Sequence, residues 1–195
     1  MAARPVFYYD FSSPYAYLAA ERVNSVLPEP AAWRPISFGF LLRHTGRTPW
    51  SLGPGREDGM RDVEERAAER GLPPVRWPEG WPQESYSLAP LRAAVFAAQT
   101  GRLEAFSLAA FRQAFAAGRR LDDLDNVVLA AAACELHPRA VLKGIETESV
   151  KSGLREATEA AIERGVVGIP TVEVGEELFW GDDRLEEAAE AMAAA

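Results

Sequence analysis

Hydrophobic and polar positions follow a strand–helix–strand pattern at the start of the chain. Residues 6–11 form a short apolar run rich in aromatic side chains, which predicts a buried strand. Residues 14–26 carry apolar side chains near helical spacing, and Pro28 and Pro30 end that helix. Residues 33–38 alternate again and predict a second strand. Because a helix separates the two strands, we expect them to be parallel, with a right-handed connection.

The middle of the chain lacks strand patterns. Residues 44–58 are rich in glycine and proline and predict a long loop, and residues 72–83 hold four prolines and predict irregular structure. Asp125 or Asn126 is a candidate helix N-cap, and glycines at 71, 101, 118 and 165 are candidate helix stops. The expected helices span 58–70, 88–100, 103–117, 125–136, 138–144 and 150–164.

The last thirty residues return to strands and close with a helix. Residues 171–174 and 177–180 are separated by Gly175 and Glu176, which predicts an antiparallel hairpin. An amphipathic, alanine-rich helix then ends the chain. The complete order predicts an α/β protein with a thioredoxin-like fold and an all-helical insertion domain. We assign residues 1–45 and 165–195 to a discontinuous thioredoxin-like domain, and residues 46–164 to the insertion.

Composition and charge narrow the function. The net charge is −8, which argues against nucleic acid as a partner because phosphate binding needs clustered positive charge. The sequence shows neither a membrane-spanning apolar run nor a signal peptide, so we expect no membrane partner and a cytoplasmic location. Cys134 is the only cysteine, which excludes an internal disulfide and a cysteine cluster. We expect it to be a buried, unreactive thiol in the middle of a helix, and we expect no metal.

Candidate chemistry lies where the first strand meets the first helix. A helix start offers unpaired N–H groups and the positive end of the helix dipole. Disulfide oxidoreductases of this fold place Cys-Pro-x-Cys there, whereas this chain has Ser13 and Ala16 at the two cysteine positions. Disulfide exchange is therefore not expected. The simpler alternative is that Ser13 only caps the helix, with Pro14 at its first position.

A second motif precedes the third strand. Thioredoxin folds carry a cis-proline there, facing the start of the first helix, so we predict a cis Ile169–Pro170 bond and a site between Ser13 and Pro170. An ordinary trans proline at a strand start is the alternative. His44 and His137 lack a recognisable partner and are not expected to be catalytic.

The segments FYYDFSSPYAYLA, RGVVGIPTVEVG and ELFWGDDRLEE together resemble the 2-hydroxychromene-2-carboxylate isomerase family. That family has a Dsb-type thioredoxin fold and is related to the kappa-class glutathione transferases. The resemblance covers essentially the whole chain. It implies a glutathione-dependent isomerase that acts on a small-molecule intermediate of aromatic degradation, and it suggests a homodimer. In such an enzyme the thiol adds reversibly to an unsaturated carbonyl compound and then leaves.

The resemblance also implies roles for individual residues. Ser13 would donate a hydrogen bond to the glutathione sulfur. The Ile169 backbone, just before Pro170, would pair with the cysteinyl part of the thiol, and Asp182 and Asp183 would hold its γ-glutamyl end. From the residues alone, the two aspartates are also explained as helix caps.

Two features leave alternatives open. The family typically has an asparagine in the loop after the second strand, where this chain has Arg47 and Thr48, so another low-molecular-weight thiol could replace glutathione. Trp77 and Trp81 could line an aromatic pocket or simply pack a proline-rich loop. A kappa-like glutathione transferase and a non-catalytic thiol- or peptide-binding module are the alternative functions.

Overall fold

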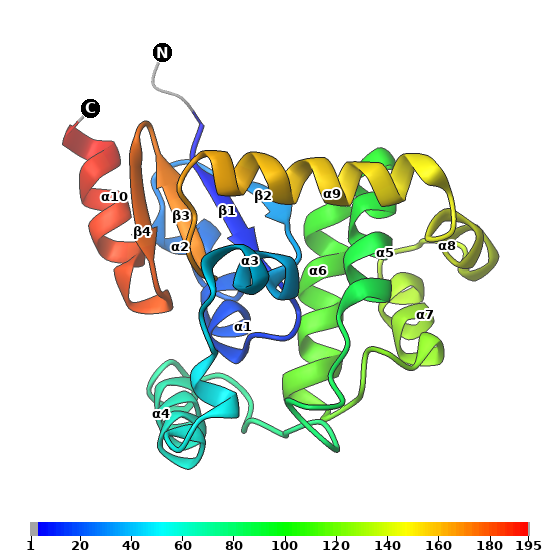
Figure 1. Ribbon diagram of the computed structural model, residues 1–195, viewed down its shortest axis with the longest axis horizontal. Coiled ribbons are helices and arrows are strands. Elements are labelled where there is room, and N and C mark those ends of the chain that lie inside the picture. The colour runs from blue at the N-terminus through cyan, green and yellow to red at the C-terminus, as the bar shows by residue number, and fades with distance from the viewer. Residues whose placement is uncertain (1–3, 195) are drawn as a thin grey trace.

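In the computed structural model, which describes residues 4–194, one four-stranded mixed sheet forms the left half of the view in Figure 1. The strand order is β2-β1-β3-β4. Strand β1 runs parallel to β2 and antiparallel to β3, and β3 pairs antiparallel with β4. This arrangement confirms the predicted thioredoxin-like sheet. The strands are β1 (Val6–Tyr9), β2 (Ala32–Pro35), β3 (Thr171–Val174) and β4 (Glu177–Trp180).

The rest of the described chain is helices and loops, and most of the helices lie between β2 and β3, as the predicted helical insertion requires. The elements before β2 and after β4 are α1 (Pro14–Ala20), α2 (Val23–Val26), η3 (Asp182–Arg184) and α10 (Leu185–Ala194). The elements between β2 and β3 are α3 (Phe38–Thr45), η1 (Trp50–Leu52), α4 (Arg56–Glu69), α5 (Leu88–Gln99), α6 (Leu103–Phe111), the π-helical turn η2 (Arg112–Ala116), α7 (Leu124–Ala133), α8 (Pro138–Gly144) and α9 (Glu148–Glu163).

Two differences from the sequence prediction lie near the sheet. The single helix expected over residues 14–26 is broken at Glu21 and Arg22, where the Arg22 backbone leaves helical geometry. The second strand ends at Pro35 because Ser37 caps the helix α3, which the sequence did not predict. The backbone N–H of Phe38 donates to the carboxylate of Asp10 at 2.8 Å, and this bond fixes the start of α3 against the end of β1.

Two predictions on helix ends were wrong. Asp123, rather than Asp125 or Asn126, caps α7 through its side chain. Cys134 lies at the C-terminal end of α7 and not in the middle of a helix. His137, three residues further on, caps the start of α8, where its Nδ1 accepts from the backbone N–H of Arg139. The glycine stops were predicted correctly, since all four have positive φ at helix ends: Gly71, Gly101, Gly118 and Gly165.

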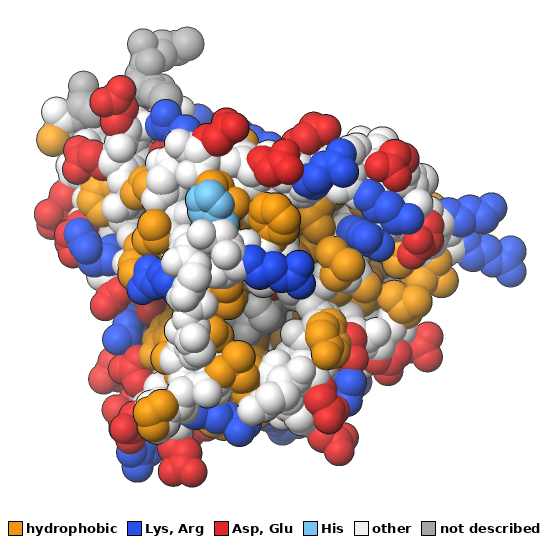
Figure 2. Space-filling view, in the orientation of Figure 1, with side chains coloured by type: hydrophobic (Ala, Val, Ile, Leu, Met, Phe, Trp, Pro, Cys, Tyr) orange, Lys and Arg blue, Asp and Glu red, His pale blue; other side chains and the backbone are white. Residues whose placement is uncertain are grey.

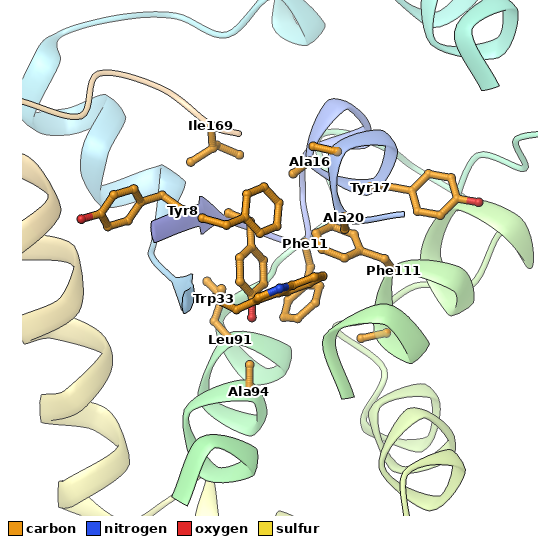
Figure 3. Close-up of a cluster of buried hydrophobic side chains, with 14 of the residues drawn as sticks. Tyr8, Phe11, Ala16, Tyr17, Ala20, Trp33, Leu91, Ala94, Phe111 and Ile169 are labelled. Carbon is orange, nitrogen blue, oxygen red and sulfur yellow. The ribbon is translucent and has the colours of Figure 1, made fainter. Parts of the chain in front are cut away.

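The aromatic side chains of the first two strands form a core that continues into the insertion. Figure 3 shows Phe11, Trp33 and Phe111 of α6 among the buried side chains of this core. The Phe11 and Phe111 ring centroids lie 4.9 Å apart, and the buried Tyr9 hydroxyl forms a 2.6 Å hydrogen bond with Ser107 of α6. Burial of large aromatic side chains is the main source of stability here. The sheet and the insertion therefore share one core, and the domain boundaries at 45/46 and 164/165 stay a prediction.

The remaining helices set the position of the site. Helix α9 runs across the molecule from the insertion to the sheet, where it contacts β2 and leads to β3 (Figure 1). Helix α10 packs on β3 and β4, and α1 contacts both α4 and η3. The start of α1, the start of β3 and the turn η3 consequently meet at one end of the sheet. Over residues 4–194, no helix has the length and apolar character needed to cross a membrane.

Candidate active site

A cavity of about 540 Å³ opens where these three segments meet. Figure 2 shows that one face of the molecule is hollowed near its centre, with hydrophobic and basic side chains along the margin. The structure brings all the sequence-predicted site residues to this one cavity, although the first and the last of them, Ser13 and Asp183, are 170 positions apart in the chain. They are Ser13, Ile169, Pro170, Asp182 and Asp183. Their roles in binding stay predictions.

Ser13 is both a helix cap and a wall residue of the cavity. Its Oγ accepts a hydrogen bond from the N–H of Ala16 at 3.2 Å, and Pro14 occupies the first helical position, as the capping interpretation predicts. The side chain is almost fully buried, with 8% of the residue exposed. An oxygen that accepts from the helix still has its own proton to donate. No described residue accepts that proton, so the hydroxyl can donate to a ligand in the cavity.

Asp10 holds the backbone before Ser13 in place, and its own carbonyl oxygen accepts from the N–H of Ser13 at 3.2 Å. Its fully buried carboxylate accepts from the N–H of Ser12 at 2.9 Å and from the N–H of Phe38 at 2.8 Å. It thereby joins the start of α1 to the start of α3. Burial raises the pKa of the Asp10 carboxyl, and the two backbone N–H bonds oppose that rise. Sequence reasoning missed this residue, although an acidic side chain at the end of an aromatic strand is an unusual signal.

The Ile169–Pro170 peptide bond is cis, as predicted. The neighbouring backbone is held in place, because Pro170 O accepts from Gly181 N at 3.0 Å and Thr171 Oγ1 donates to Gly168 O at 2.8 Å. Gly168 must lack a side chain, since a Cβ there would lie 2.4 Å from the Trp180 ring. The N–H and C=O of Ile169 form no hydrogen bond with any residue between 4 and 194. This peptide edge can therefore pair with an extended ligand.

The two aspartates at the start of η3 differ in environment. Asp182 is buried, accepts from Arg66 Nη1 at 3.0 Å and forms a second ion pair with Arg70. Asp183 keeps 59% of its side chain exposed, and its nearest basic atom, on Arg66, lies 3.7 Å away. Although burial lowers the pKa of Arg66, the carboxylates of Asp182 and Asp62 outweigh it and raise that pKa overall. Asp183 is thus the aspartate with capacity left for a ligand ammonium.

Aromatic rings form another part of the cavity wall. Tyr15 packs edge-on against Trp50, and Trp50 packs on Trp81, each with ring centroids 5.6 Å apart. Both tryptophans and Tyr15 line the cavity, whereas Trp77 stacks behind Trp81 at 4.6 Å. The two alternatives for the tryptophans are therefore each correct for one of them. Gly59 allows Trp50 to approach α4, because a Cβ at this glycine would lie 2.4 Å from the ring. Sequence reasoning missed Tyr15 and Trp50.

The loop after α3 supplies the third wall. Arg47 and Thr48 both line the cavity. His44, His137 and Cys134 do not line this cavity, and their lack of a catalytic role stays a prediction. In the described part of the chain, His, Cys, Asp and Glu side chains form no group of three or more suited to a metal ion.

The fold and the site together define a class of protein. A mixed four-stranded sheet, a cis-proline before the third strand and a helix start facing it are the features of thioredoxin-like proteins, here with serine at the reactive cysteine position. Comparison with known families is in agreement: the DSBA-like thioredoxin domain matches residues 6–193. The chain belongs to the DSBA-like thioredoxin domain family.

Similarity to individual proteins points to one branch of that family. The chain is 26% identical over 186 residues to the 2-hydroxychromene-2-carboxylate isomerase of Sphingobium xenophagum. The aligned region covers 92% of this chain and 93% of the relative. The chain is 27% identical over 192 residues to the isomerase of the same name from Pseudomonas sp. (strain C18), with 92% and 85% covered. A solved 2-hydroxychromene-2-carboxylate isomerase superposes with a TM-score of 0.84 at 23% identity, with 98% and 95% of the two chains covered.

Proposed function

We propose that this protein is a glutathione-dependent isomerase that acts on an unsaturated carbonyl compound of the 2-hydroxychromene-2-carboxylate type. The single observation that carries the proposal is that one cavity contains two polar groups that are free to hydrogen-bond to a ligand. These are the Ser13 hydroxyl and the free peptide edge of Ile169. Similarity to the isomerases over nearly the whole chain supports the choice of reaction.

Ser13 has the role of holding the sulfur as a thiolate. Its hydroxyl donates a hydrogen bond to the sulfur while its oxygen continues to accept from Ala16 N. Hydrogen bonds to a charged group are stronger than neutral ones and favour the ionised form. The start of α1 adds the positive end of a helix dipole. Both effects lower the pKa of a thiol bound beside Ser13.

The peptide portion of the thiol has matching partners around the cavity. The N–H and C=O of Ile169 pair with the cysteinyl backbone as one rung of a sheet ladder. Pro170 and Trp180 hold that edge in place. Asp183 accepts the ammonium of the γ-glutamyl group, and Asp182 acts indirectly by positioning Arg66 and the start of η3.

The electrophile occupies the aromatic side of the cavity. When bound, the thiol supplies a nucleophile that adds reversibly to the unsaturated compound. Tyr15, Trp50 and Trp81 form an apolar wall suited to a flat aromatic compound. Such a wall also excludes water from the reacting carbon.

The experiment mixes the wild-type protein with glutathione and an aryl-substituted unsaturated 2-oxo acid. Isomerisation is followed by absorbance, and total free thiol is titrated at the end. We expect thiol-dependent conversion with the thiol concentration unchanged. Loss of thiol in step with conversion would instead identify a transferase. Thiol binding without any conversion of several such electrophiles would identify a binding module and refute the enzymatic function.

A further inference from the structure

The cavity holds an uneven distribution of charge. Four charged side chains line it, and three of them form one network in which Arg66 contacts Asp182 at 3.0 Å and Asp183 at 3.7 Å. The fourth, Arg47, forms no salt bridge with any residue that the structure describes. The wall formed by the loop after α3 therefore carries a positive charge that the protein itself leaves unneutralised.

The Arg47 side chain is nevertheless held in a definite place. Its guanidinium carbon lies 4.4 Å from the centre of the Trp180 ring, and its Nη1 lies 3.5 Å from the carbonyl oxygen of Val167. A stacked guanidinium keeps its N–H groups in the plane of the group, where they remain free to donate. The contact with Val167 is long for a hydrogen bond, so it uses little of the capacity of the guanidinium to donate hydrogen bonds. Stacking thus orients the donors without using them.

Arg47 also lies beside the peptide edge that the proposed function uses. Trp180, on which it stacks, contacts Gly168, and Val167 precedes that glycine by one residue. A ligand paired with Ile169 consequently passes close to the guanidinium. Asp183 also lines the cavity and presents its exposed carboxylate there. The cavity therefore holds a cation that has no carboxylate partner in the described residues, together with the network of Arg66 and the two aspartates.

We propose that Arg47 binds a carboxylate of a ligand in this cavity and makes the site selective for anionic ligands. This inference rests on the proposed thiol-dependent function. Arginine suits the role because its planar fork matches both oxygens of a carboxylate. Two ligands can supply that group: the terminal carboxylate of glutathione, or a carboxylate on the electrophile. The competing explanation is that Arg47 only packs on Trp180 to anchor its loop, in which case its charge has no effect on binding.

The first arm of the test measures thiol binding by calorimetry. The ligands are glutathione and its glycine monoethyl ester, which removes the terminal charge. The proteins are wild type, Arg47→Gln and Arg47→Lys, with Arg43→Gln as a matched control because Arg43 is exposed on α3 outside the cavity. If the thiol supplies the carboxylate, esterification weakens binding to wild type about tenfold, as expected for one charge-assisted hydrogen bond. Arg47→Gln weakens glutathione binding equally and abolishes the effect of the ester.

The second arm measures turnover with an aryl-substituted unsaturated 2-oxo acid and its methyl ester. If the electrophile supplies the carboxylate, KM for the acid rises about tenfold in Arg47→Gln with little change in kcat, and KM for the ester is the same in both proteins. Arg47→Lys keeps the positive charge but loses the planar guanidinium. It should therefore show part of the wild-type preference for the acid over the ester, in the arm where Arg47→Gln abolishes that preference. Arg43→Gln behaves as wild type in both arms.

The inference is supported if, in either arm, Arg47→Gln weakens binding or raises KM for the acid and has no effect with the ester. The arm that responds identifies which ligand supplies the carboxylate. Equal effects of Arg47→Gln on acid and ester in both arms would overturn it and leave Arg47 as a packing residue. That result would not affect the proposed function, provided the wild-type protein binds glutathione and turns over. Failure of the wild-type protein to bind either form of the thiol would overturn the proposed function and this inference together.

Discussion

The Oδ1 atom of Asp182 lies 3.0 Å from Nη1 of Arg66, and this ion pair joins the start of η3 to α4. Arg70, the C-cap residue of α4, contacts the other oxygen of the same carboxylate. A helix of the insertion is thereby fastened to the thioredoxin-like sheet beside the cavity. Asp182 and Asp183 are consecutive in the chain, yet they differ in role. Asp182 is used in the ion pairs with α4, whereas Asp183 stays exposed to the cavity.

We predict that substitution separates these roles. Asp182→Asn leaves two arginines without their buried partner, so the free energy of unfolding should fall by about 3 kcal/mol. Asp183→Asn removes an exposed charge, so stability should stay within about 0.5 kcal/mol of wild type, while glutathione binding weakens about threefold to tenfold. Urea unfolding and calorimetry measure the two quantities. Equal stability losses in both variants would show that the ion pair does not hold α4.

Cys134 gives a second prediction. The residue is 7% exposed, and burial raises the pKa of its thiol, which keeps it protonated and unreactive at neutral pH. Cys134→Ala should therefore leave thiol-dependent turnover unchanged and lower the free energy of unfolding by only about 1 kcal/mol. In the wild type, iodoacetamide should label the folded protein far more slowly than the urea-unfolded chain. Fast labelling of the folded protein would contradict this account of Cys134.

The sequence predicts the sheet and the paired site motifs well because their signals are local. Residues 6–9 and 171–174 show short apolar or β-branched runs next to turns. Ser13-Pro14 and Ile169-Pro170 each have an ordinary local explanation, as a helix cap and as a proline at a strand start, but their occurrence together in this order is distinctive. No local pattern shows that the two motifs lie close together. That expectation comes from the places that the motifs occupy in a known fold.

What sequence reasoning missed depends on contacts between distant segments. Helix α3 starts where it does because Phe38 donates to the buried carboxylate of Asp10, 28 residues earlier. Trp50 becomes part of the site only because Gly59 leaves room for its ring. Likewise, Asp182 is bound by arginines more than a hundred positions away. Each of these features requires knowledge of the tertiary structure.

Asp10 supports a prediction on pH dependence. Burial raises the pKa of its carboxyl above the ordinary value of 3.8, so the folded protein holds this proton to a higher pH than the unfolded chain. The stabilising contribution of this group is then fully present below about pH 3.8 and declines as the pH rises through the folded pKa. Asn at this position has no proton to lose, although its amide nitrogen cannot accept one of the two backbone N–H bonds.

Asp10→Asn should consequently be less stable than wild type at low pH, and the difference in unfolding free energy should shrink as the pH rises above about 4. Urea unfolding of both proteins across that pH range measures the difference directly. A difference that grows with pH would mean that the carboxylate anion is the form the fold prefers, with the N–H groups of Ser12 and Phe38 outweighing burial.

The last prediction separates the two roles of Ser13. Its oxygen caps α1, so Ser13→Ala should lower the free energy of unfolding by about 0.5–2 kcal/mol whether or not a thiol binds. Ser37→Ala is the matched control, because Ser37 caps α3 in the same way and does not line the cavity. Both variants should therefore lose stability by similar amounts, and only the Ser13 variant should lose function.

If the Ser13 hydroxyl also donates to a thiolate, Ser13→Ala should raise the pKa of bound glutathione and slow turnover about tenfold to a hundredfold. Ser13→Thr keeps a hydroxyl and should restore much of both properties. Absorbance of the thiolate as a function of pH, measured beside turnover, reports the bound pKa independently of stability. An unchanged thiol pKa and an unchanged rate in folded Ser13→Ala would reduce Ser13 to a helix cap. The thiolate would then depend on the dipole of α1 and on its unpaired backbone N–H groups.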